Sequence, residues 1–70
     1  MTENQWREAA ATAVRLFDAG MRKEAVAEIA QVLEDYATTD QLRILRKQVQ
    51  NFRHAGIRKV VQMVCRRAGV

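Results

Sequence analysis

The sequence is poor in the residue types that usually mark a reactive or metal site, with one cysteine, one histidine and no proline among its 70 residues. A single cysteine excludes a disulfide within the chain, and one cysteine with one histidine is fewer than the three or four ligands of a zinc site. The three glycines are isolated from one another, which excludes a glycine-rich phosphate loop. We therefore expect no cofactor, no metal and no enzymatic activity.

Cys65 and His54 are the sole candidates for nucleophilic chemistry. They fall on different predicted helices, with His54 near the C-terminus of one of them, where the helix dipole favours an imidazolium. We expect Cys65 to act as a small apolar residue beside the core rather than as a nucleophile.

A long apolar run is also absent. No stretch approaches the roughly 20 apolar residues that span a bilayer, and residues 1–4 lack the basic and apolar regions of a signal peptide. An unpaired cysteine fits a reducing compartment. Together these absences predict a cytoplasmic protein with no membrane partner.

Apolar and charged residues are both plentiful. Hydrophobic residues make up 49% of the chain, enough to build a core, and charged residues make up 29%. We expect one domain, 1–70, and a core of this size supplies only about 3–5 kcal/mol of stability. Self-association would add to that stability, so a homodimer is expected.

One short pattern, Ala-Gly-x-Arg-Lys, occurs twice, at 19–23 and 55–59, and its glycines Gly20 and Gly56 are 36 residues apart. Glycine suits the left-handed residue that ends a helix, because no side chain opposes a positive φ. Each glycine is therefore predicted to turn the chain between two helices. The prediction is an all-α fold of four helices, arranged as two tandem antiparallel helical hairpins at 4–37 and 40–68, with Thr39 or Asp40 capping the third helix.

Apolar residues recur at helical spacing within the four predicted helices, at about 4–19, 21–37, 40–55 and 57–68. The apolar arc of the second helix is wide enough to touch two neighbours, and we expect it to pack on the first and third helices. The fourth helix has no fifth helix to cover it, so a dimer through the fourth or the second helix is expected.

Residues 16–34 have the pattern Leu-Phe-x-x-Gly-x-x-x-Glu-Ala-Val-x-x-Ile-x-x-Val-Leu-Glu. Within 9–37 this pattern resembles the tetratricopeptide repeat, whose first helix ends in glycine and whose second helix opens with Glu-Ala and ends in a small-Leu-Glu triplet. Ala9 and Ala37 occupy the places of the family's early aromatic residue and closing proline. The resemblance implies a scaffold that holds a peptide or a partner segment on its concave side, and not an enzyme.

Charge is divided unevenly along the chain. Residues 1–40 hold all eight acidic side chains and four basic ones, a net charge of −4, whereas residues 41–70 hold eight basic side chains and no acidic one, a net charge of +8. Such asymmetry indicates a charged partner. The candidate binding residues on the third and fourth helices are Arg43, Arg46, Lys47, Gln50, Arg53, Arg58, Lys59, Gln62 and Arg66.

Three readings of this basic surface are open. In the first, it binds an acidic protein surface, either that of a partner protein or the acidic first hairpin of a second copy, and the chain is a non-enzymatic regulator, an adaptor or an inhibitor. In the second, it binds nucleic acid, with arginines on phosphates and glutamines on base edges, although Phe52 and Gln62 occupy positions that fit a helix-turn-helix DNA reader poorly. In the third, the acidic second helix neutralises the basic residues within the fold.

Overall fold

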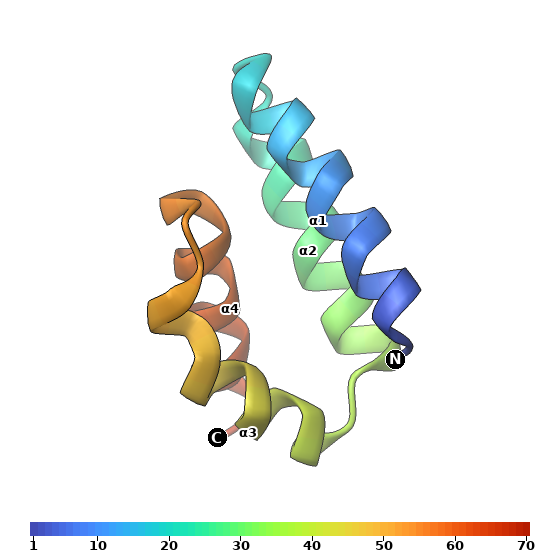
Figure 1. The fold of residues 1–70 in the computed structure, drawn as a ribbon, viewed down its shortest axis with the longest axis vertical. Helices are drawn as coiled ribbons and strands as arrows, with labels where there is room; N and C mark the ends of the chain where they lie inside the picture. Colours follow the sequence, from blue (N-terminus) through green and yellow to red (C-terminus); the bar gives the residue numbers. More distant parts are fainter.

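The computed structural model describes residues 1–70 as four α-helices and one short 3-10 helix. Figure 1 shows α1 and α2 as one long hairpin, with a shorter hairpin of α3 and α4 beside it. The predicted all-α fold of two tandem antiparallel helical hairpins is confirmed. None of the helices combines the length and the apolar composition that a membrane span requires. The elements are α1 (Glu3–Asp18), α2 (Arg22–Tyr36), α3 (Thr39–Gln48), η1 (Val49–Asn51) and α4 (Ala55–Arg67).

The first hairpin turns at Gly20, as predicted. Gly20 has a φ of 77°, and the amide of Met21 donates to the carbonyl of Leu16 at 2.8 Å, which closes the end of α1. This six-to-one hydrogen bond is typical of helices that end in a left-handed glycine. Ala9, Ala13 and Ala25 are buried where α1 meets α2, and their small side chains let the two helices approach closely.

The second hairpin turns before Gly56, so the prediction that Gly56 ends a helix is wrong. The third helix was expected to reach Ala55, but α3 ends at Gln48 and is followed by η1 and an extended turn through Phe52 and His54. His54 caps α4, since its Nδ1 accepts a hydrogen bond from the amide of Ile57 at 3.4 Å. Because the cap lies ahead of the glycine, Gly56 is the second residue of α4.

Gly56 has a steric role instead of a conformational one. A Cβ atom at this position would lie 2.7 Å from Cζ of Phe17, a residue of the first hairpin. The Phe17 ring therefore occupies the space beside α4 that a side chain would need. Phe17 also stacks on His54, with ring centroids 4.9 Å apart, and Trp6 of α1 lies 5.9 Å from Phe52. Aromatic residues of α1 thus hold the second turn in place.

The last helix is the central helix of the fold. α4 contacts α1, α2 and α3, and α2 packs on α1 and α4 rather than on α3, which corrects the expected packing. The expectation that the fourth helix has an uncovered apolar edge is also wrong, because the other three helices cover that edge. α3 is only ten residues long and its narrow apolar stripe serves one neighbour, whereas α4 has a wider apolar face. The buried residues of α4 are Ile57, Val60, Val61, Val64 and Cys65.

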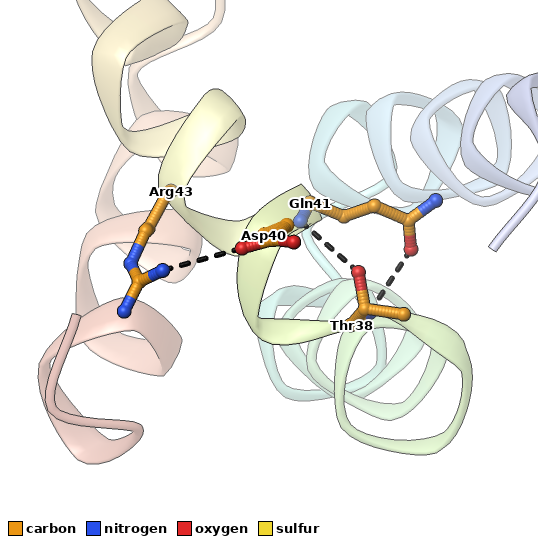
Figure 2. Close-up of polar contacts among 4 residues, drawn as sticks. All are labelled: Thr38, Asp40, Gln41 and Arg43. Carbon is orange, nitrogen blue, oxygen red and sulfur yellow. Dashed lines mark hydrogen bonds and ion pairs between the residues drawn. The ribbon is translucent and has the colours of Figure 1, made fainter.

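The link between the hairpins is fixed by Thr38, one residue before the expected caps. Thr38 Oγ1 accepts from the amide of Gln41 at 3.1 Å, and Gln41 Oε1 accepts from the amide of Thr38 at 3.0 Å (Figure 2). This reciprocal pair satisfies two amides at the start of α3. Gln41 Nε2 also donates to the carbonyl of Met1 at 2.6 Å. One side chain thereby joins the start of α3 to the start of the first hairpin.

Candidate functional site

A groove of about 400 Å³ runs between α3 and α4 on the basic hairpin. Each wall contributes one arginine and one glutamine: Arg46 and Gln50 follow the α3 side, and Gln62 and Arg66 follow α4. Val49, Cys65 and Val70 line its base. Val49 and Cys65 are buried, so most of the exposed surface of the groove is polar. We call this site, with its seven lining residues, the basic groove.

A second hollow of about 430 Å³ adjoins the basic groove, with which it shares Arg46 and Val70. Its other lining residues are Arg43, Lys47 and Gly69. Because α3 and α4 are antiparallel, the start of α3 lies beside the end of α4. The two hollows therefore form one continuous surface that presents four cations.

The structure brings together six of the nine predicted binding residues and separates three. Arg58 is committed to the second turn, where its guanidinium donates to the carbonyls of Phe52 and Arg53. Arg53 and Lys59 are exposed but line neither hollow. The six residues that converge on the two hollows are Arg43, Arg46, Lys47, Gln50, Gln62 and Arg66.

The acidic half of the chain leaves the basic groove unneutralised. The structure has three ion pairs, and two of them join neighbours in one helix. These two are Arg7 with Glu3, and Arg43 with Asp40, of which Figure 2 shows the second. The third joins Arg67 of α4 to Glu34 of α2 at 3.9 Å. Neutralisation within the fold is thus limited to residues outside the walls of the basic groove, and Arg46 and Arg66 have no acidic partner.

Cys65 is placed for packing. Its Sγ lies 3.5 Å from the carbonyl of Leu42, and burial raises the pKa of the thiol, an effect that the nearby Arg46 guanidinium partly offsets. A protonated thiol is a weak nucleophile. His54 caps the N-terminus of α4, not the C-terminus of a helix as expected, and it lies about 16 Å from Cys65 along the helix axis. The two residues are therefore too far apart to act as a nucleophile and its general base.

Sequence reasoning found the charged walls of the groove but not its floor. Cys65 was expected beside the core and is buried, as is Val49. Val49 is adjacent in the sequence to Gln50, and Cys65 to Arg66, so each lies next to a groove-wall residue. This adjacency was a weak sequence signal for the groove floor. No group of three or more histidine, cysteine or acidic residues is arranged to hold a metal ion.

No family model, curated protein or solved structure matches this chain. The resemblance of the first hairpin to a tetratricopeptide repeat therefore stays a prediction.

Proposed function

We propose that this chain is a non-enzymatic regulatory protein, an adaptor or an inhibitor, that binds an acidic segment of a partner protein in the basic groove. The observation that carries the proposal is a groove with one arginine and one glutamine on each wall, whose arginines have no acidic partner in the fold. Arginine is enriched in protein interfaces. Arginine also binds carboxylates through two parallel hydrogen bonds, which gives direction as well as charge.

The groove fits a protein segment better than a nucleic acid. A duplex is bound by cations spread along a line of phosphates. Here the cations gather around one hollow, with Arg46 on the α3 side and Arg66 on α4. The cytoplasmic location expected from the sequence stays a prediction.

The proposal is tested with two labelled probes and fluorescence anisotropy. One probe is an acidic helical peptide with glutamates spaced by four and three residues, and the other is an arbitrary DNA duplex of about 20 base pairs. We expect the peptide to bind in about 50 mM NaCl and to remain bound in about 150 mM. The double variant R46Q/R66Q should lose at least about tenfold in affinity for the peptide.

The matched control is R7Q/R15Q, which removes the same charge from exposed positions of α1 and should bind the peptide as the wild type does. Duplex binding that is tighter than peptide binding and falls steeply with salt would replace this proposal with the nucleic-acid reading. Failure to bind either probe, or equal losses in the two double variants, would remove the basic groove as a binding site.

A further inference from the structure

α2 carries a straight ridge of polar side chains along its solvent side. The ridge consists of Glu24, Glu28, Gln31 and Asp35, and we call it the acidic ridge. Spacings of four, three and four residues place these side chains on one face of a helix. All four are exposed, and none of the three carboxylates takes part in an ion pair. The ridge is therefore available to a partner with positive charge.

The acidic ridge lies beside α1 and off the buried stripe of its own helix, since Glu28, Gln31 and Asp35 line a shallow hollow between α1 and α2. The buried stripe of α2 is formed by Ala25, Ile29 and Leu33, on a different side of the helix. α2 meets the basic hairpin of its own chain at another position, through the ion pair between Glu34 and Arg67. The ridge thus has no access to the basic groove of the same molecule, and only a second molecule can bring the two together.

The acidic ridge and the basic groove match in chemistry. The ridge presents three carboxylates and one amide, and the groove walls present two guanidinium groups and two amides. Glu28 and Asp35 are two helical turns apart, about 10 Å along the axis. A helix laid between two other helices directs such side chains at both walls, which is a common way for a groove to recognise a helix.

We infer that the acidic ridge of one copy docks into the basic groove of a second copy, so that the chain associates with itself head to tail. This inference rests on the basic groove being the binding site proposed above. Each molecule would keep one unused ridge or groove after pairing, so the contact builds rings or open chains. An acidic partner would compete with the second copy for the groove, which couples partner binding to disassembly.

Sedimentation velocity of full-length protein variants tests the head-to-tail contact. In low salt, about 50 mM NaCl, we expect the wild type to associate more as its concentration rises. E28Q/D35N keeps the groove but loses two of the three charges of the ridge, and R46Q/R66Q keeps the ridge but loses both arginines of the groove. Each double variant alone should sediment as a monomer, with self-association at least about tenfold weaker than in the wild type.

The mixture of the two variants is the decisive sample. One intact ridge and one intact groove remain, so an equimolar mixture should form a one-to-one heterodimer and nothing larger. E3Q/D18N and R7Q/R15Q change net charge by the same amounts at exposed positions of α1 and should associate as the wild type does. Circular dichroism checks that every variant is folded.

Three outcomes would overturn the inference: a monomeric wild type up to about 1 mM protein, a mixture that stays monomeric, or variants that still associate as the wild type does. The acidic peptide separates this failure from that of the proposed function. Peptide binding by a strictly monomeric protein would leave the function standing and remove self-association. Self-association through the ridge without peptide binding would leave the groove with no use except assembly.

Discussion

The same five-residue pattern, Ala-Gly-x-Arg-Lys, follows the end of a helix in the first hairpin and begins a helix in the second. In the first hairpin it follows the end of α1, and Gly20 takes a φ of 77°. In the second hairpin it begins α4, and Gly56 lies in an ordinary helical turn. The difference lies in what precedes the pattern, since His54 caps α4 before the glycine is reached. A repeat in sequence therefore need not be a repeat in structure.

The two glycines are needed for different reasons, and this links the hairpins. No atom lies within 4 Å of a Cβ built on Gly20, so its backbone conformation is what excludes a side chain. At Gly56 the backbone is ordinary and the ring of Phe17 is the obstacle. The second turn therefore packs against a residue of the first hairpin, so the two hairpins form a single structure.

The largest effect should come from the shared core. Independent hairpins would unfold separately, whereas the buried residues here form one cluster. Ile29→Ala removes a fully buried side chain of α2 and should lower the free energy of unfolding by about 2–5 kcal/mol. Urea denaturation should show one transition for both hairpins in circular dichroism and in the NMR signals of α4. An α4 that keeps its native signals after α1 and α2 unfold would contradict this.

Gly56→Ala should have the next largest effect on stability. The added methyl group overlaps the Phe17 ring, and overpacking of this kind destabilises by about 1–3 kcal/mol. In a Phe17→Ala background the obstacle is gone, and the same change should stabilise by up to about 1 kcal/mol because alanine favours a helix over glycine. The test is a double-mutant cycle measured by urea denaturation. An identical effect of Gly56→Ala in both backgrounds would rule out the steric role.

Gly20→Ala should cost about 1 kcal/mol, because a side chain disfavours the left-handed conformation. Gly20→Asn should cost less, since asparagine adopts that conformation more readily. At Gly56 asparagine should not be better tolerated than alanine, because asparagine is larger and meets the same Phe17 ring. Thermal unfolding of the four variants gives the comparison. A common order at both positions would mean that the two glycines have one role.

The smallest expected effect is a gain in stability from a new helix cap at the start of α2. Met21 occupies the N-cap of α2, is 44% exposed and makes no side-chain capping hydrogen bond, whereas Thr2 and Thr38 cap α1 and α3. Met21→Asp should raise the free energy of unfolding by about 0.5 kcal/mol, because a carboxylate can accept from the free amides of the first turn. Met21→Ala is the control and should not stabilise. A loss of stability with aspartate would show that the methionine side chain matters more than the cap.

Sequence reasoning was most successful in the first hairpin. There the apolar spacing and Gly20 agree, and both helices lie within a few residues of their predicted bounds. It failed at the end of α3, because Leu45, Val49 and Phe52 keep a helical spacing through η1 although the α-helix has already ended. The capture of Arg58 by two carbonyls of the turn was equally hidden, since it depends on where that turn lies.

The central place of α4 and the floor of the basic groove could not be predicted from the sequence either. A wide apolar face on one helix does not say which neighbours will cover it, and that choice is made by packing of all four helices together. The charge division was visible in the sequence and gave the groove walls. Their convergence over Val49 and Cys65 appears only when α3 and α4 are placed side by side.

None of the buried residues has a polar or charged side chain. An interior made only of hydrocarbon groups and one thiol accepts many exchanges among leucine, isoleucine, valine and methionine when the total volume is kept. Such positions should tolerate these exchanges better than Ala13, Gly20 and Gly56 tolerate a larger side chain. Relatives of this chain should therefore be recognised by where small residues must stay small rather than by the identity of the large ones.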